Sequence, residues 1–419
     1  MKGLFVTFIL LFYGPVLWAV ENLELNLQSG TTMSITHYQG DAKSLLMWIP
    51  FERGFQPGYV PVALNLAVMG YDIWAVDLHG SYMVPASRNS MNKFDPHDLV
   101  ELFKIAQAQG YKEIFLLSSG RGVQLALKAL YLFQLDQTDS RLIKGSVFFY
   151  PHLIEGRPNP GMQAEFVEIS KLSNLPVYLF MPEYSTKYAH RLEISKQLQK
   201  GGSAVFIHNL KDVNAGFHMR PEEDLTEPDM AMKDKLPDLY ENAFRLIRGQ
   251  PYQPLFQKVS LIEKEDPLQS AYRESKLHPY RGEKTPPELN LSEIGGQVIN
   301  LQDFKGQVVL VNFWATWCGP CVEEIPSLSR MEERLKDKPF KILTVNIGEP
   351  KKVILKFMEE IDFRFPIMMD VDGQAARDWK VYAYPSNYLI DKKGKIQYAY
   401  RGALEWDAPE ILKTIESLF

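Results

Sequence analysis

The stretch Val308-Val-Leu-Val-Asn-Phe-Trp-Ala-Thr-Trp-Cys-Gly-Pro-Cys321 decides the fold of the C-terminal third of the chain. Its first half is a run of branched and aromatic residues, typical of a strand buried on both faces of a parallel sheet. A short turn follows, and Cys318 stands where a helix is expected to begin. The helix is predicted to reach Leu335, because apolar residues recur at helical spacing, namely Val322, Ile325, Leu328, Met331 and Leu335.

The position of Cys318 favours a reactive sulfur. Unpaired backbone N–H groups and the helix dipole stabilise a thiolate at the start of a helix. Cys321, one turn later, is placed to reach back and release a partner bound to Cys318. A zinc site needs two further ligands, and the eight histidines offer no suitable spacing. A structural disulfide would close too short a loop to stabilise much. We therefore favour redox exchange, with no metal and no cofactor besides the Cys318–Cys321 disulfide.

The motif resembles the active site of the thioredoxin superfamily, particularly its exported TlpA/ResA-like branch. The resemblance runs from about Thr285 to Phe419 and implies a thioredoxin fold. Pro287-Glu-Leu-Asn-Leu and Val298-Ile-Asn-Leu-Gln-Asp-Phe-Lys-Gly306 resemble the N-terminal hairpin of that branch. Tyr384-Pro385, followed by Asn387-Tyr-Leu-Ile-Asp-Lys-Lys-Gly394, matches the family's cis-proline loop and the next strand.

The resemblance also implies roles for individual residues. Cys318 is expected to attack and Cys321 to resolve, while Trp317, Tyr384 and Pro385 are expected to contact the substrate. Glu324 matches an acidic residue of the branch and would relay a proton to Cys321. The alternative for Glu324 is a solvated helix carboxylate, and Glu323 beside it leaves that alternative open. Asn312 stands where thioredoxin itself has a buried acid, which argues against a relay of that type.

The dipeptide Gly319-Pro320 bears on the direction of electron flow. It occurs in reducing thioredoxins, at about −270 mV, whereas the strong oxidant of this group lies at about −120 mV. That difference is worth roughly 7 kcal/mol for two electrons. We therefore expect a reductant of disulfides in client proteins, apo-cytochromes c being one possibility. A membrane electron donor of the thioredoxin-reducing type would restore the dithiol.

The region 21–250 alternates short apolar runs with amphipathic stretches, which predicts an open α/β sheet. It resembles the α/β-hydrolase fold through Tyr71-Asp-Ile-Trp-Ala-Val-Asp-Leu-His-Gly-Ser81 and Ile114-Phe-Leu-Leu-Ser-Ser-Gly-Arg-Gly122. A functional elbow reads G-x-S-x-G, with the serine on a sharp turn. Here the five elbow positions are Ser118-Ser-Gly-Arg-Gly122, so that Gly120 stands in place of the nucleophile.

Other hydrolase residues are present in part. Glu183 and His218 follow late strands in the right order for an acid and a base, and Ser119 lies one residue away from the nucleophile position. Without a nucleophile no acyl-enzyme forms, so we expect a degenerate domain used for binding or positioning. Two alternatives remain: a serine hydrolase with a redox-regulatory appendage, and a binding protein whose thioredoxin-like domain is only a docking platform.

Residues 1–20 are typical of an export signal. Lys2 supplies a positive charge, residues 4–13 are almost entirely apolar, and Gly14-Pro15 interrupts the segment. We therefore expect a periplasmic or otherwise extracytoplasmic protein, in contact with a membrane only if the signal is uncleaved. Two neighbouring cysteines and no others suit export, because neither has a stray partner for mispairing.

Length and composition set the remaining expectations. The 419 residues exceed one ordinary core, and 46% apolar with 23% charged residues is typical of a folded protein. The formal net charge of −5 gives no reason to expect nucleic acid. Prolines and charges concentrate in 251–284. The expected order is a signal at 1–20, a hydrolase-like domain at 21–250, a linker at 251–284 and a thioredoxin-like domain at 285–419.

Overall fold

The computed structural model describes residues 6–9, 20–40, 43–87, 90–136, 141–155, 160–255 and 277–419. Most of the expected export signal and residues 256–276 of the expected linker lie outside the described residues. The chain divides into two compact units: unit 1 is Met1–Leu153 with Phe166–Glu263, and unit 2 is Ile154–Glu165 with Lys264–Phe419. Residues 154–155 and 160–165 are predicted from the sequence to belong to the first domain, whereas their contacts group them with unit 2.

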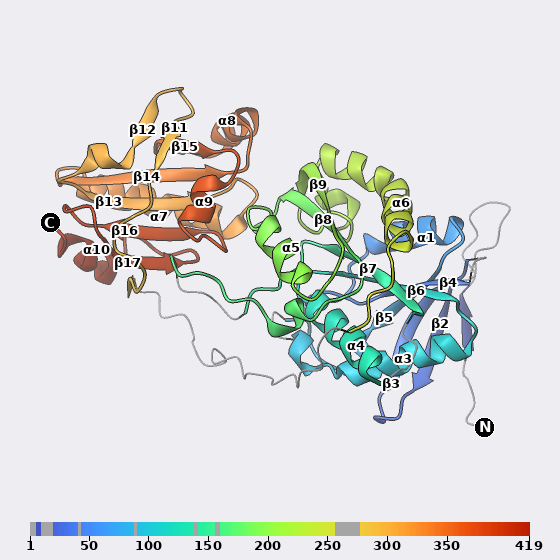
Figure 1. Cartoon of the computed structure of the whole chain (residues 1–419). Helices are drawn as coiled ribbons and strands as arrows, with labels where there is room; N and C mark the ends of the chain where they lie inside the picture. The colour runs from blue at the N-terminus through green and yellow to red at the C-terminus, as the bar shows by residue number, and fades with distance from the viewer. Residues whose placement is uncertain are drawn as a thin grey trace. The chain divides into compact units, whose positions relative to one another are not determined.

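A mixed sheet forms the centre of unit 1 (Figure 1). Its strands lie in the order β1-β2-β3-β5-β4-β6-β7-β8-β9. β3 is antiparallel to both of its neighbours, and the strands from β5 to β9 are parallel to one another. The strands are β1 (Val6–Ile9), β2 (Val20–Asn26), β3 (Thr32–Tyr38), β4 (Ser44–Trp48), β5 (Asp72–Asp77), β6 (Glu113–Ser119), β7 (Ile143–Phe149), β8 (Val177–Tyr184) and β9 (Val205–Asn214).

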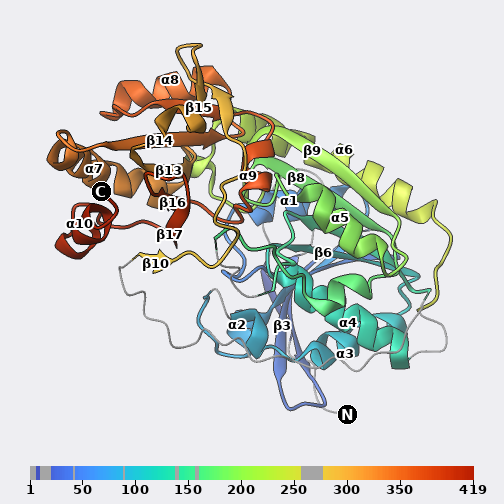
Figure 2. The same ribbon diagram turned by 60° about the vertical axis from the view of Figure 1, so that its left-hand side comes forward.

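Helices cover both faces of this sheet. The helices are α1 (Tyr59–Val68), α2 (Leu78–Ser81), α3 (Pro96–Ala108), α4 (Gly122–Asp136), α5 (Arg191–Gln199) and α6 (Glu227–Arg248), with short 3-10 helices at Ser90–Lys93, Glu168–Lys171 and Glu222–Asp224. α1 and α6 share one buried core with side chains from β4 to β9. α3 packs against α4, which contacts β6, and Figure 2 shows this pair on the opposite face from α6. The expected open α/β sheet is therefore confirmed for unit 1.

Local sequence signals explain where these helices begin. The Asp95 side chain caps α3 by accepting a hydrogen bond from the His97 backbone N–H at 2.9 Å. Pro96 then occupies the first turn, where its missing N–H costs nothing. Thr226 and Asp229 form a capping box at the start of α6.

Unit 2 is built on a six-stranded sheet in the order β10-β17-β16-β13-β14-β15. β13, β14 and β15 are parallel, and β16, β17 and β10 alternate in direction. The strands are β10 (His278–Pro279), β13 (Val308–Trp314), β14 (Phe340–Ile347), β15 (Ile367–Asp370), β16 (Ser386–Ile390) and β17 (Ile396–Arg401), beside the hairpin of β11 (Asn290–Ser292) and β12 (Val298–Asn300). This is a thioredoxin fold, and the predicted N-terminal hairpin is confirmed.

Two cores lie on the two faces of this second sheet. One core joins alternate residues of β13 to α7, α8 and α10. The other core joins the remaining apolar residues of β13 to α9 and to side chains from the segment before β13. Because both faces of β13 are covered, all seven of its residues are buried. The helices are α7 (Gly319–Leu335), α8 (Lys351–Glu360), α9 (Gln374–Asp378) and α10 (Pro409–Glu416), with a 3-10 helix at Leu301–Phe304.

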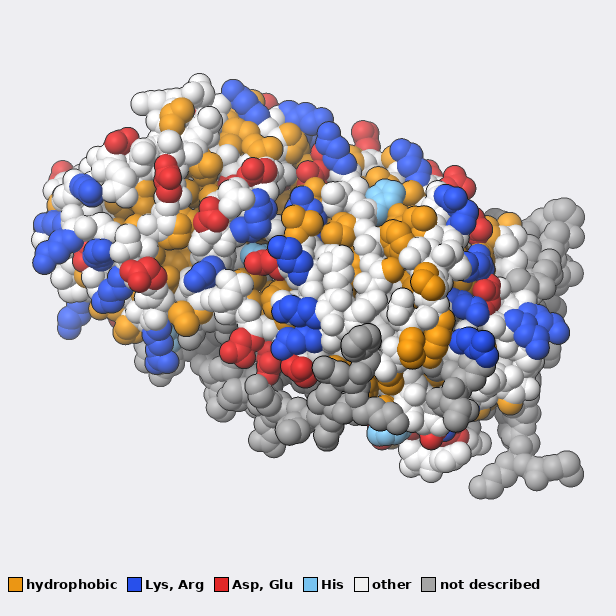
Figure 3. All heavy atoms as spheres, in the orientation of Figure 1, with side chains coloured by type: hydrophobic (Ala, Val, Ile, Leu, Met, Phe, Trp, Pro, Cys, Tyr) orange, Lys and Arg blue, Asp and Glu red, His pale blue; other side chains and the backbone are white. Residues whose placement is uncertain are grey.

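The molecular surface is mixed in charge. On the face drawn in Figure 3, basic and acidic side chains are interspersed rather than gathered by sign, which agrees with the formal net charge of −5. Within the part of the chain that the structure describes, no helix has the length and apolar character needed to cross a membrane.

Candidate active site

The deciding stretch of sequence forms a strand, a turn and a helix, as predicted. β13 ends at Trp314, and Cys318 is the N-cap residue of α7. Its carbonyl accepts hydrogen bonds from the backbone N–H groups of Cys321 at 2.9 Å and Val322 at 3.1 Å. The Cys318 sulfur therefore lies at the N-terminal end of a long helix, where the helix dipole favours negative charge.

Cys318 and Cys321 form a disulfide with a Cα–Cα distance of 5.2 Å. The two residues differ in exposure: Cys318 is 7% exposed and Cys321 is 2% exposed. Both belong to the core shared by β13, α7 and α10. Both residues are largely buried, and the more exposed of the two is the one at the N-terminal end of the helix.

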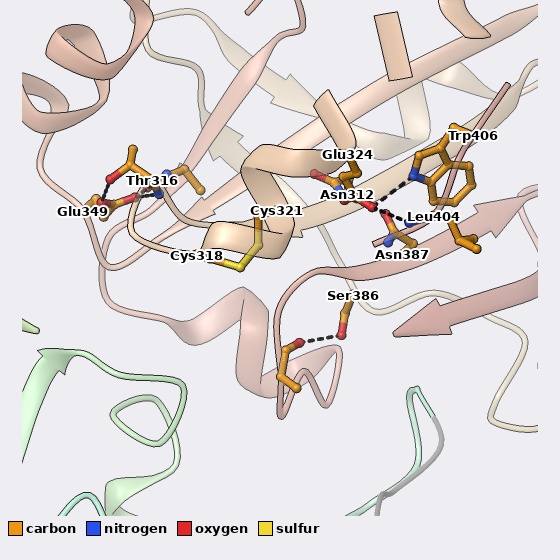
Figure 4. The surroundings of a disulfide bond; sticks show 12 residues. Asn312, Thr316, Cys318, Cys321, Glu324, Glu349, Ser386, Asn387, Leu404 and Trp406 are labelled. Atoms are coloured by element: carbon orange, nitrogen blue, oxygen red, sulfur yellow. Dashed lines mark hydrogen bonds between the residues drawn. A yellow bond between two sulfur atoms is a disulfide. The ribbon is translucent and has the colours of Figure 1, made fainter. Parts of the chain in front are cut away.

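Glu324 is buried and hydrogen-bonded, so the solvated-carboxylate alternative for it is wrong. It is 2% exposed, and its carboxyl accepts hydrogen bonds from Asn312 Nδ2 at 2.7 Å and from Trp406 Nε1 at 3.1 Å. Burial raises the pKa of Glu324 to about 8, against the opposing effect of these hydrogen bonds. Figure 4 shows Glu324 on the same helix as the disulfide, with its carboxyl turned toward Trp406 and Leu404.

Asn312 connects Glu324 to the neighbouring strand. Its side-chain amide donates to Glu324 at 2.7 Å and to Asn387 Oδ1 on β16 at 2.7 Å. Both asparagines are buried, and they lie opposite each other in the β13–β16 pairing. The buried carboxyl of Glu324 is therefore held by neutral donors from β13 and from the segment before α10, and Asn387 on β16 holds the Asn312 amide in place.

The residues predicted to contact substrate lie together beside the disulfide. The Trp317 and Tyr384 rings meet edge to face with centroids 5.8 Å apart, and both pack against the core that contains the two cysteines. The Tyr384–Pro385 peptide bond is cis, as predicted. Pro385 O accepts a hydrogen bond from Gly402 N at 2.9 Å, which ties the loop to the end of β17.

Sequence reasoning missed a second buried acid, Glu349, between β14 and α8. It is 1% exposed, and its carboxyl accepts hydrogen bonds from Thr316 N at 2.7 Å, from the Thr316 hydroxyl and from Asn346 Nδ2 at 2.7 Å. Burial raises the pKa of Glu349. Thr316 lies two residues before Cys318, so Glu349 fixes the turn that carries the reactive sulfur (Figure 4). Its place directly after a buried strand was the available signal.

The elbow of unit 1 differs from a working nucleophile site. Gly120 has φ +54°, and a Cβ added there would lie 2.8 Å from Glu52 Oε2. The next amide, Arg121 N, donates to Glu52 Oε2 at 3.0 Å. The position that a nucleophile would occupy is thus Gly120, which has no side chain. The Glu52 carboxylate accepts the hydrogen bond of the next backbone N–H, that of Arg121.

Ser119, Glu183 and His218 do not form a triad within the described residues. Glu183 accepts a hydrogen bond from Asp212 N at 2.9 Å. The His218 ring stacks on Phe149 with centroids 3.9 Å apart. Its Nδ1 has no hydrogen-bond partner in the described part of the chain, and burial lowers the pKa of His218 to about 3. A general base needs hydrogen-bond reach to its nucleophile, and this histidine is placed as a core residue.

Across the described ranges, no group of three or more His, Cys, Asp or Glu side chains is arranged to hold a metal ion.

Comparisons with known proteins concern the C-terminal region. Residues 282–399 match the AhpC/TSA family. The chain is 34% identical over 134 residues to the thiol-disulfide oxidoreductase ResA of Geobacillus kaustophilus, which is 32% of this chain and 76% of that protein. It is 34% identical over 140 residues to the thioredoxin-like protein YneN of Bacillus subtilis, which is 33% of this chain and 81% of that protein.

Solved structures match over a similar share of the chain. A putative thiol:disulfide interchange protein DsbE from Chlorobium tepidum is 29% identical with a TM-score of 0.29, covering 34% of this chain and 96% of that one. The N-terminal domain is unassigned. Through its C-terminal domain, the chain belongs to the AhpC/TSA family of thioredoxin-like proteins and is related to the ResA/TlpA thiol–disulfide oxidoreductases.

Proposed function

We propose that the protein is an extracytoplasmic thiol–disulfide oxidoreductase that reduces disulfides in exported client proteins. The observation that carries the proposal is the Cys318–Cys321 disulfide at the first turn of α7, with Cys318 the more exposed residue. The relatives described as thiol-disulfide oxidoreductases match the region that holds this pair and support the same reaction.

The first step is attack by the reduced enzyme. The Cys318 thiolate attacks one sulfur of a client disulfide, a bond forms between Cys318 Sγ and that sulfur, and the client's sulfur–sulfur bond breaks. The second client sulfur leaves as a thiolate and takes a proton from water. The N-terminal end of α7 stabilises the attacking thiolate, and the Trp317 and Tyr384 rings border the place where the client arrives.

The second step releases the client. Cys321 loses its proton, its thiolate attacks Cys318 Sγ, and the first client sulfur leaves as a thiolate that is then protonated. The client has gained two electrons, and the enzyme holds the Cys318–Cys321 disulfide. We assign the proton of Cys321 to Glu324, one helical turn away. A carboxyl with a pKa of about 8 exchanges a proton with a thiol of pKa about 8.5 at little cost in free energy.

Restoring the dithiol requires two electrons and two protons, for which we propose a membrane electron donor of the thioredoxin-reducing type. The Gly319-Pro320 dipeptide supports the reducing direction, because the same dipeptide occurs in reductants of about −270 mV. Apo-cytochromes c are one candidate class of client. The extracytoplasmic location rests on the apolar segment near the N-terminus and on the use of two adjacent cysteines.

For the N-terminal domain we propose a degenerate α/β-hydrolase fold that serves in binding or positioning. The strand order β2-β3-β5-β4-β6-β7-β8-β9, with β3 antiparallel, supports that fold. Gly120 at the elbow and the Glu52–Arg121 hydrogen bond argue against a serine hydrolase. Labelling of Ser119 by a fluorophosphonate probe would revive the hydrolase alternative.

The test of the proposed function is reduction of insulin with dithiothreitol as electron source. Wild-type protein should accelerate insulin reduction, and Cys318→Ser should lower the rate by at least about a thousandfold, because it removes the nucleophile. Cys321→Ala should hold clients as mixed disulfides on Cys318, and these can be identified from the exported proteins of the native host. A wild-type protein that turns over no disulfide would contradict the proposal.

A further inference from the structure

The thioredoxin-like unit is discontinuous in sequence. The chain passes from unit 1 to unit 2 after Leu153 and returns to unit 1 at Phe166. A backbone hydrogen bond from Glu155 N to Glu165 O, 2.8 Å long, closes the base of this excursion. We call residues 160–165, the described part nearest the tip, the strap. Gly161 and Ala164 of the strap are buried, although Met162 between them is 41% exposed.

Gly161 seats the strap against two tyrosines of unit 2. A Cβ added at Gly161 would lie 1.7 Å from Tyr280 Oη and 2.5 Å from Tyr280 Cζ. A backbone hydrogen bond joins Gly161 to the Tyr388 hydroxyl, which itself donates to Trp379 O at 2.8 Å. With φ at +74° and no room for a side chain, only glycine fits this position without displacement.

Ala164 provides a second anchor. Its backbone N–H donates to Tyr382 Oη at 3.1 Å, in a buried environment. Tyr382 is 4% exposed and Tyr388 is 1% exposed. Bulk water therefore cannot replace the strap as hydrogen-bond partner of either hydroxyl unless the tyrosine moves. Buried polar groups of this kind keep their partners because an unpaired one is costly.

The two anchored tyrosines bracket the cis-proline loop. Tyr382 lies three residues before Pro385, and Tyr388 lies three residues after it on β16. Tyr384, in direct ring contact with Trp317, lies between them. The strap therefore holds both ends of the segment that borders the disulfide, although it is distant from that segment in sequence.

We infer that the strap is a positioning element for client binding: by fixing Tyr382 and Tyr388, it holds the loop around Pro385 in the shape that accepts an extended, disulfide-bearing polypeptide. This inference rests on the proposed reductase function. The anchors of the strap are tyrosines and not the two cysteines, so we expect it to act on the docking of a polypeptide and not on the exchange of electrons. A small disulfide that makes no use of the loop should be indifferent to the strap.

The test compares two glycine-to-alanine variants in the full-length chain. Gly161→Ala introduces the clash with Tyr280, whereas Gly394→Ala, with φ +75° and no atom within 4 Å of its added Cβ, introduces the same backbone strain alone. We expect Gly161→Ala to raise KM for insulin on the order of tenfold, with kcat and the reduction potential unchanged. Turnover of oxidised glutathione should stay at the wild-type rate. Gly394→Ala should match wild type in all four measurements.

Hydrogen exchange over residues 381–388 is measured on the same proteins and needs no turnover. Faster exchange in Gly161→Ala than in Gly394→Ala supports the strap's role even if the wild type reduces no disulfide, an outcome that would remove the proposed function alone. Equal exchange in the two variants, or an unchanged KM for insulin, would overturn the inference. If Gly161→Ala does not fold, Tyr382→Phe replaces it, because it removes only the hydroxyl that accepts from Ala164, and the same outcomes apply.

Discussion

The start of α7 and the start of α4 are the same piece of architecture put to different uses. Each follows a buried strand and a tight turn, and each turn leads into the N-terminus of a helix, where the helix dipole favours negative charge. At α7 this end meets the sulfur of Cys318. At α4 the corresponding turn carries Gly120, and the Arg121 amide is bonded to Glu52. The comparison teaches that a strand–turn–helix supplies a polarised position and that one side chain decides whether chemistry occurs there.

Buried acids sharpen the contrast. Glu324 lies on the same helix as Cys321, with neutral donors around it and a raised pKa, which suits the proposed proton exchange. At the elbow, one carboxylate oxygen of Glu52 instead accepts a hydrogen bond from the Arg121 backbone N–H, the group that a substrate oxyanion would need as its donor. One acid is placed for the proposed proton exchange with Cys321, and the other occupies the position where a substrate oxyanion would bind.

Among the substitutions that test the two acids, the largest effect is expected from Glu324→Gln. The amide keeps the shape of the side chain but cannot take up the proton of Cys321, so we expect the resolving step to slow by about a hundredfold near pH 7. Stopped-flow measurement of mixed-disulfide decay checks this result. Glu323→Gln is the matched control, because it makes the same change at an exposed neighbour on the same helix. Equal decay rates in the two variants would remove Glu324 from the mechanism.

The pH dependence of stability tests the same acid without any turnover. Burial raises the pKa of Glu324 to about 8, above its ordinary value of 4.5. A raised pKa stabilises the folded state fully below the unfolded value, and this stabilisation is lost as pH rises through the folded value. Wild type should therefore lose up to ~3 kcal/mol of unfolding free energy between about pH 5 and 8 that Glu324→Gln does not lose.

Denaturant unfolding of the oxidised proteins at several pH values provides this measurement. Glu323→Gln should follow the wild-type curve, since its carboxylate is exposed. Parallel curves for wild type and Glu324→Gln would mean that the carboxyl is already ionised in the folded protein.

The elbow is tested by Gly120→Ala. The added methyl group meets Glu52 Oε2 at 2.8 Å and forces a side chain onto φ +54°, so we expect a loss of about 2 kcal/mol in unfolding free energy. Gly110→Ala, also at positive φ but with nothing within 4 Å of its Cβ, measures the backbone strain alone. If both variants lose the same amount, Glu52 does not occupy the elbow. Adding Glu52→Ala to Gly120→Ala should recover the difference.

The smallest expected effect comes from Glu349→Gln. The amide keeps one acceptor for Thr316 but places a donor opposite another donor, which should cost about 1 kcal/mol of unfolding free energy and change the insulin rate by less than about threefold. Thermal unfolding and the insulin assay check both values. Glu359→Gln, at an exposed position on α8, serves as the control. If the loss in rate were larger than that of Glu324→Gln, Glu349 would have a direct role in the reaction.

Much of this architecture could be predicted from local sequence. The run from Val308 to Trp314 forms β13 with the predicted bounds, because a strand buried on both faces leaves a continuous apolar signature. The cis bond at Pro385 followed from the resemblance alone. Both depend on residues that are neighbours in the chain.

Long-range packing could not be predicted in the same way. The burial of Glu324 depends on Trp406, 82 positions later. α6 continues through Pro237, although proline ordinarily ends a helix, so local propensity alone does not predict its length. Nothing local to residues 154–165 indicates that they pack with unit 2, since Gly161 finds its partners more than a hundred positions away. An apolar pattern in the sequence identifies which face of a segment is buried, but it does not identify the residues that pack against that face.

The discontinuity of unit 2 has a consequence for the gene as well as for the protein. If two reading frames had simply been joined end to end, each domain would consist of one continuous segment. This thioredoxin-like unit instead includes a segment that lies within the sequence of unit 1. A truncated clone starting at residue 277 or 285 would therefore encode an incomplete domain. Recombination that exchanged either half for a homologue's would separate Gly161 and Ala164 from the tyrosines that they contact.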